Sequence, residues 1–149
     1  MDYGLKQETL RLLNQRSEAH NGIQFNEAGK YWMINTKPIG KPRMTQRDQW
    51  AKRPVVQRYW EMKDILKEQV GENLQCQRLL LCYLFKPPMS WSKKRKEAAL
   101  GKPKLTRPDL DNLVKGTLDS LFKEDSVVYE IQAIKLWWDH SAIIIQEIE

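Results

Sequence analysis

The sequence has little of what disulfide-stabilised, zinc-binding or membrane-spanning proteins require. It contains two cysteines and two histidines in 149 residues, and neither type forms a cluster with zinc-ligand spacing. No apolar run approaches the roughly 20 residues that span a bilayer, and the N-terminus has no signal-peptide pattern. These shortages favour a cytoplasmic protein that has no membrane partner and keeps its thiols reduced.

Length and composition predict one folded domain. The chain is long enough for a single core, and its 41% apolar and 30% charged residues are typical of globular proteins. The net charge of +6 is unevenly distributed along the sequence. Residues 37–53 carry six basic and one acidic side chains, and residues 86–107 carry eight and one. Residues 108–149 reverse this balance, with three basic and nine acidic side chains.

This charge pattern indicates a phosphate-containing ligand and a cation. Clustered Lys and Arg favour the phosphate backbone of nucleic acid, because their binding releases condensed counterions. An acidic region in the same protein would repel that backbone unless a cation neutralised it. The acidic C-terminal stretch is therefore a first indication of a metal site.

Hydrophobic periodicity and turn residues predict an α+β domain. Helical spacing occurs in residues 5–20, 55–70 and 110–122, and SWSKKRKEAALGK predicts a short helix with Ser92 as its N-cap. β-rich runs lie at 31–39, 79–85, 126–138 and 141–148, which predicts a sheet of about four strands. The run LLLCYLF at 79–85 is continuously apolar, as expected of a central strand buried on both faces. The last two runs are predicted to form a hairpin across Asp139-His140.

The helix predicted at 110–122 begins with paired aspartates. Asp109 and Asp111 stand where unpaired N–H groups and the helix dipole favour carboxylates. An N-cap followed by an acidic first turn is therefore a purely structural interpretation. Lys115 follows Asp111 by one helical turn, and Asp125 lies between this helix and the next strand, from where the chain can fold back toward Asp109. These two further residues favour a catalytic site.

Three carboxylates at one place would suit magnesium. Mg²⁺ prefers oxygen ligands and is usually held by one or two carboxylates together with substrate phosphates. Asp109, Asp111 and Asp125 are therefore candidate Mg²⁺ ligands, and Lys115 is a candidate catalytic lysine. The alternative for Lys115 is a salt bridge to Asp111 or Asp119 at helical spacing.

The stretch RPDLDNLVKGTLDSL, followed by EDSVV, resembles the signature of RusA-type Holliday junction resolvases, the crossover junction endodeoxyribonucleases. The segments PRMTQRDQW and SWSKKRKE resemble the phage and prophage branch of that family. The resemblance covers roughly residues 31–148. It implies a RusA-like endonuclease domain over residues 31–149, with a mixed sheet and packed helices, after a helical extension over residues 1–30.

By this resemblance Asp109 and Asp111 are the paired essential aspartates, Lys115 is the essential lysine, and Asp125 is the third aspartate. The implied activity is Mg²⁺-dependent hydrolysis of phosphodiesters in Holliday junctions or other branched DNA, during recombination and repair. A homodimer is expected, because a four-way junction has approximate two-fold symmetry. The strand at 126–138 or the run Ile143, Ile144, Ile145 could supply its interface.

The basic segments supply candidate contacts to DNA phosphates, which position DNA without reading its bases. Trp50 and Trp91 lie within these segments and could stack on unpaired bases or, as the preferred interpretation, anchor the core. Two alternative functions remain open: a less selective flap or fork nuclease, and a non-catalytic DNA-binding accessory protein whose acidic cluster only caps a helix. The candidate phosphate contacts are Lys41, Arg43, Arg47, Lys93, Lys94, Arg95, Lys96, Lys104 and Arg107.

Overall fold

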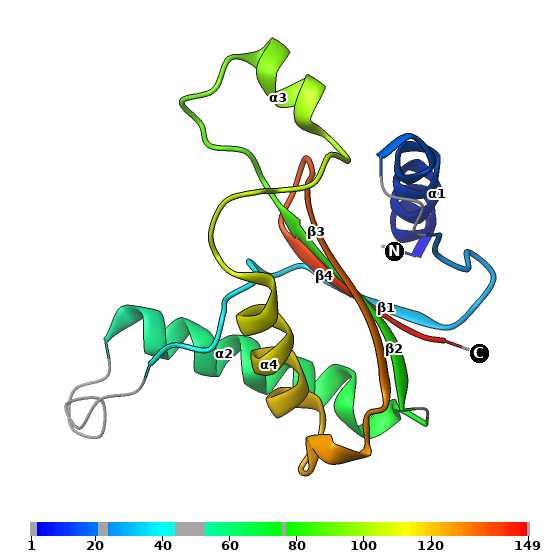
Figure 1. The fold of residues 1–149 in the computed structure, drawn as a ribbon, viewed down its shortest axis with the longest axis vertical. Coiled ribbons are helices and arrows are strands. Elements are labelled where there is room, and N and C mark those ends of the chain that lie inside the picture. Colours follow the sequence, from blue (N-terminus) through cyan, green and yellow to red (C-terminus); the bar gives the residue numbers. More distant parts are fainter. Residues whose placement is uncertain (1–2, 21–23, 44–52, 76, 149) are drawn as a thin grey trace.

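The structure is a computed structural model that describes residues 3–20, 24–43, 53–75 and 77–148. It forms a single small α+β domain, as predicted, with four α-helices and a four-stranded mixed sheet in the described residues (Figure 1). The elements are α1 (Tyr3–His20), β1 (Tyr31–Ile34), α2 (Pro54–Gln69), the 3₁₀ helix η2 (Gly71–Asn73), β2 (Arg78–Phe85), α3 (Lys93–Ala99), α4 (Leu110–Leu121), the 3₁₀ helix η3 (Asp125–Val127), β3 (Glu130–Trp137) and β4 (Ala142–Glu147).

The sheet has the strand order β1-β4-β2-β3. Strands β2 and β3 are parallel, with Arg78 opposite Glu130 and Phe85 opposite Trp137. Strand β4 runs antiparallel to both of its neighbours, β1 and β2. The predicted central strand is confirmed, because β2 lies between β4 and β3 and every residue after Arg78 is buried.

The predicted hairpin between the last two strands is wrong, because β2 separates β3 from β4. Residues 138–141 instead cross the end of β2. The N–H of Trp138 donates to the carbonyl oxygen of Phe85 at 2.9 Å, and the N–H of Lys86 donates to Ser141 Oγ at 3.2 Å. The crossing spans two inter-strand spacings, roughly 10 Å, which a four-residue link can bridge.

Helices cover both faces of the sheet (Figure 1). On one face, α2 and α4 pack over Leu79, Leu81 and Tyr83 of β2. On the other face, Leu10 and Leu13 of α1 belong to a second buried cluster with alternate residues of β2 and β4. The N-terminal helix is thus part of the core. Ile143, Ile144 and Ile145 are fully buried in β4, so the predicted dimer surface at these residues does not exist.

Helix α4 packs as its apolar spacing predicts. Leu113, Leu118 and Leu121 are buried, and the partly buried Val114 packs against the same core. Gly116 allows a close approach in the middle of the helix, since a Cβ added there would lie 3.1 Å from Tyr59 Cε1 and 3.4 Å from the backbone nitrogen of Lys41. This contact brings α2 and the segment after β1 against the N-terminal half of α4.

Candidate active site

The paired aspartates stand at the start of α4, and both are exposed. Asp109 is the N-cap residue, but its side chain makes no capping hydrogen bond; only its carbonyl oxygen accepts, from Leu113 N–H at 3.1 Å. Ser92 behaves differently, because its Oγ caps α3 by accepting from Arg95 N–H at 3.2 Å. The Asp109 carboxylate is therefore not used to cap its helix.

The carboxylate of Asp111 accepts a hydrogen bond from the N–H of Asn112 at 2.9 Å. Lys115 is exposed and lies one helical turn further along α4. The salt bridge to Asp119 considered for Lys115 is not seen, because Asp119 pairs with Lys41 at 2.6 Å. The start of α4 thus presents two carboxylates and an ammonium group to solvent.

Asp125 does not join this pair within one chain. It opens η3, beyond the opposite end of α4, and twelve helical residues rise about 18 Å. Two hydrogen bonds also place Asp125 and the start of α4 at opposite ends of the sheet. Lys135 Nζ, near the end of β3, donates to Pro108 O at 2.7 Å just before α4. Tyr129, just after η3, donates through its N–H to Gln77 O at 3.2 Å, next to the start of β2.

The expected fold-back of Asp125 is therefore wrong for a single chain. In the described ranges, no group of three or more His, Cys, Asp or Glu side chains is placed to hold a metal ion. The physical reason is the parallel pairing of β2 with β3, which requires the chain to return along α4 to the far end of the sheet before β3 begins.

A cavity of about 400 Å³ lies beside the start of α4. Asn112 holds one wall of this cavity in place. Its side-chain Nδ2 donates to Lys41 O at 3.0 Å, and its backbone carbonyl oxygen accepts from Lys41 N–H at 3.4 Å. Arg58, from α2, lines the same cavity and was missed by the sequence analysis, because it lies outside both basic segments. The other charged lining residues are Lys37, Lys41 and Arg43.

Lys104 is not available as a DNA contact. It is 7% exposed, and its Nζ donates to Thr106 Oγ1 at 2.6 Å and to Arg107 O. Its ammonium group also lies 4.7 Å from the centroid of the Trp137 ring. Burial, followed by the nearby charges of Lys135 and Lys37, lowers the pKa of Lys104. This lysine stabilises the protein interior.

The other candidate phosphate contacts differ in exposure. Lys96 is half-buried, and Arg47, like Trp50, lies outside the described residues. Trp91 is half-buried and packs against Trp137, with ring centroids 5.0 Å apart, while Arg95 stacks on Trp91 at 3.8 Å; Trp91 belongs to neither buried core cluster. Helix α3 projects beyond the end of the sheet (Figure 1). The exposed cations of the predicted set are Arg43, Lys93, Lys94, Arg95 and Arg107.

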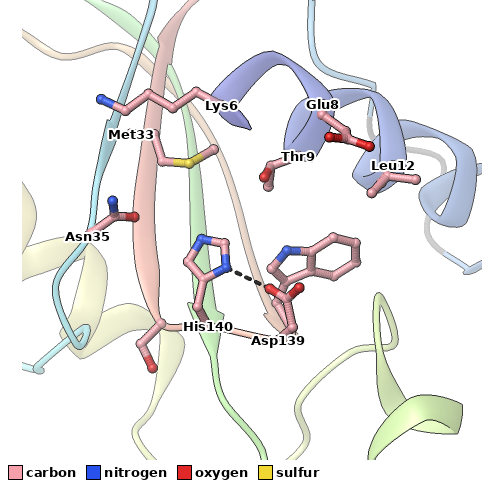
Figure 2. Close-up of a pocket in the computed structure, with 10 residues that line it drawn as sticks. Lys6, Glu8, Thr9, Leu12, Met33, Asn35, Asp139 and His140 are labelled. Carbon is pink, nitrogen blue, oxygen red and sulfur yellow. Dashed lines mark hydrogen bonds and ion pairs between the residues drawn. The ribbon is translucent and has the colours of Figure 1, made fainter. Parts of the chain in front are cut away.

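The larger cavity in Figure 2, of about 630 Å³, lies elsewhere. It is formed by α1, the end of β1 and the connection between β3 and β4, on the sheet face opposite α4. His140 Nδ1 lies 2.6 Å from Asp139 Oδ1 in its wall. None of the predicted catalytic or DNA-binding residues that the structure describes lines this cavity, so it is separate from the candidate active site.

Comparison with known proteins identifies the family. Residues 34–148 match the family model of endodeoxyribonuclease RusA, and the matched region contains Asp109, Asp111, Lys115 and Asp125. No curated protein matches the chain significantly. Among the described residues, no helix is long and apolar enough to cross a membrane. Because the match covers most of the sequence, and the start of α4 carries the expected carboxylates beside a cationic cavity, the chain belongs to the RusA family of endodeoxyribonucleases.

Proposed function

We propose that this protein is a Mg²⁺-dependent nuclease that cuts four-way and other branched DNA arising in recombination and repair. The observation that carries the proposal is the pair of exposed carboxylates, Asp109 and Asp111, beside a cavity lined by four cations. The donor set fits the metal, because Mg²⁺ is commonly held by one or two carboxylates and completes its shell with water and phosphate oxygens.

The residues around this pair have separate roles in the proposed reaction. Bound Mg²⁺ would supply charge neutralisation and water activation at the scissile phosphate. Lys115 neutralises the charge that develops on the phosphate oxygens in the transition state. Arg43 and Arg58 bind the DNA backbone in the cavity, and the exposed cations of α3 bind it further away.

A second copy of the chain would complete the site. The outer edge of β3 is partly covered, because Lys104 N–H bonds to Lys135 O, Trp137 N–H bonds to Lys102 O, and Pro103 bridges to Leu136. In the part of the chain that the structure describes, no strand covers the edge at residues 130–134. Antiparallel pairing of two such edges generates a two-fold homodimer, which matches the symmetry of a four-way junction.

This dimer also brings Asp125 to the active site. Antiparallel pairing over residues 130–134 places the start of one β3 beside residue 134 of the other, and the next residue, Lys135, is tied to Pro108 at the start of α4. The partner's Asp125 would therefore approach Asp109 and Asp111. We therefore propose that Asp125 of each protomer completes the active site of its partner, because within one chain Asp125 lies beyond the opposite end of α4 from Asp109 and Asp111.

Mixed dimers test this assignment. Asp111→Asn and Asp125→Asn chains are each expected to bind a synthetic four-way junction without cutting it. In a mixture, half of the dimers contain one of each chain. If Asp125 acts across the dimer, each mixed dimer has one intact site and one doubly substituted site, so the mixture nicks junctions. If all ligands came from one chain, every site would carry a substitution and no nicking would appear.

Controls separate the parts of the proposal. Wild-type protein that binds the junction in Mg²⁺ without cutting would leave only an accessory role, and equal cutting of flaps, forks and junctions would indicate the less selective nuclease. An Asp125→Asn protein that cuts like wild type would remove Asp125 from the site. Sedimentation of the wild type on junction DNA checks the dimer directly, and calorimetric titration with Mg²⁺ checks whether Asp111→Asn weakens metal binding.

A further inference from the structure

Leu105 is presented to solvent with 89% of its surface exposed. It lies between Lys104 and Thr106, close to the exposed Arg107 and four residues before Asp109. Within the described residues only Met89, at 90%, is an equally exposed large apolar side chain. Single apolar residues are common on surfaces, so exposure alone does not indicate a function for Leu105. The hydrogen bonds that fix the loop around Leu105 do indicate one.

The loop around Leu105 is fixed on both sides by two lysines. Lys104 N–H donates to Lys135 O at 3.0 Å, and Lys104 Nζ donates to Thr106 Oγ1 at 2.6 Å and to Arg107 O. Lys135 Nζ donates to Thr106 O at 2.6 Å and to Pro108 O at 2.7 Å. The ammonium groups turn inward and satisfy the loop carbonyls, so the apolar side chain is the one that points out.

The surroundings of Leu105 select nucleic acid as the occupant. Residues 102–107 contain two exposed cations, Lys102 and Arg107, and no acidic side chain. An apolar protein surface would have to bury these charges, whereas DNA phosphates pair with them while the bases accept an apolar side chain. DNA-binding proteins insert Leu, Met and similar wedges between base steps, partly unstacking them.

We propose that Leu105 is a wedge that inserts between the bases at the branch point and so favours branched DNA over continuous duplex. The proposal rests on the proposed function and adds a structural basis for substrate selection. A branch point is the place where base stacking is already interrupted, so insertion there disrupts less stacking than insertion into continuous duplex. Four residues span at most about 14 Å, which keeps the branch point close to Asp109 and to the cut.

The test uses junctions with the fluorescent base 2-aminopurine at the branch point, in EDTA so that no strand is cut. Wild-type protein should raise the fluorescence, because unstacked 2-aminopurine is brighter. Leu105→Ala should lose the rise and reduce the preference for junction over duplex roughly tenfold or more, the effect of losing one buried leucine contact. Its affinity for continuous duplex should stay within about twofold, because phosphate contacts are unchanged.

Leu12→Ala is the matched control, because Leu12 is a 36% exposed leucine of α1 on the opposite face of the sheet. It should behave like wild type. Leu105→Met keeps a long apolar side chain and should retain both effects, and the unchanged duplex affinity of Leu105→Ala excludes a folding defect of that variant. A Leu105→Ala protein with wild-type fluorescence change and junction preference overturns the wedge. If the wild type cuts junctions without any fluorescence change, the wedge fails while the proposed nuclease stands.

Discussion

The ammonium group of Lys41 lies 2.6 Å from a carboxylate oxygen of Asp119, one helical turn beyond Lys115. Both side chains are partly exposed, with relative accessibilities of 38% and 23%. The backbone of Lys41 is also bound to Asn112, so this residue fastens the segment after β1 to α4 at two points. Because Lys41 is paired with Asp119, it has a structural role that differs from the DNA-binding role expected of its basic neighbours.

Arg58 should contribute more to DNA binding than Lys41. Replacing Arg58 by Gln removes a cation from the cavity and should reduce the slope of log affinity against log salt by about one phosphate contact. Lys41→Gln should change the slope less, because Asp119 already neutralises Lys41. Fluorescence anisotropy of labelled junction DNA over a series of salt concentrations measures both slopes. Equal slopes for the two variants would contradict the difference.

Lys104→Met should lower the stability of the protein. The change removes the hydrogen bonds to Thr106 and Arg107, and the loop oxygens lose partners, at a cost of about 1–3 kcal/mol. The exposed Lys94 provides the control: Lys94→Met should change the free energy of unfolding by at most about 0.5 kcal/mol but weaken DNA binding. Urea denaturation and DNA titration distinguish the two lysines. A stable Lys104→Met protein would show that the loop does not depend on this lysine.

Gly116→Ala should destabilise the protein although alanine favours helices by about 1 kcal/mol. The new Cβ would lie 3.1 Å from the buried ring of Tyr59 and 3.4 Å from the backbone nitrogen of Lys41. Neither neighbour is the flexible end of a side chain, and overpacking of this kind costs about 1–3 kcal/mol. Thermal unfolding gives the sign directly, since a rise in Tm would mean that α2 can move away from α4.

Tyr59→Phe should leave stability unchanged or raise it. The Tyr59 hydroxyl is buried and has no hydrogen-bond partner among the described residues. Burial, and then the charge of Asp119, raise the pKa of Tyr59 to about 12. Because the neutral phenol is favoured in the folded state, wild-type protein loses this contribution as the pH rises from about 10 to 12. The phenyl ring of the variant cannot ionise, so its denaturation curves at pH 9 and 11 should differ less than those of the wild type.

Leu13→Ala should destabilise the whole domain by about 2–5 kcal/mol, the usual effect of truncating a buried leucine. Leu13 is 1% exposed in the core cluster between α1 and the sheet. Leu12→Ala, one residue away and 36% exposed, should cost much less. If both substitutions had equally small effects on urea unfolding, α1 would not contribute to the cooperative core.

The sequence predicted those elements whose residues carry a clear period. The apolar spacing of α4 identified Leu113, Leu118 and Leu121 as core residues, and the continuous apolar run of β2 identified a central strand. Periodicity gives the face that a residue occupies but not the neighbour of its strand. The two β-rich runs at the C-terminus were therefore assigned to a hairpin, although β2 lies between them.

The candidate site was likewise predicted where local spacing decides and mispredicted where the three-dimensional path of the chain decides. Asp109, Asp111 and Lys115 were correctly expected on one helix start, because local spacing determines their proximity. Asp125 is only four residues beyond the end of α4, but the whole length of α4 separates it from Asp109 and Asp111, which the sequence did not show. Charge also gave no indication that Lys104 is buried, since the sequence does not reveal carbonyl oxygens such as that of Arg107.

The central position of β4 constrains the order in which the domain can assemble. Strand β4 is the last of the described strands in the chain, yet among these strands β1 pairs with β4 alone. During N-to-C synthesis the parallel pair β2 and β3 can form first, whereas β1 must wait for β4 to insert beside β2. Such long-range pairing slows folding, so partly synthesised chains expose the apolar edge of β2, and the protein depends on late residues to close it.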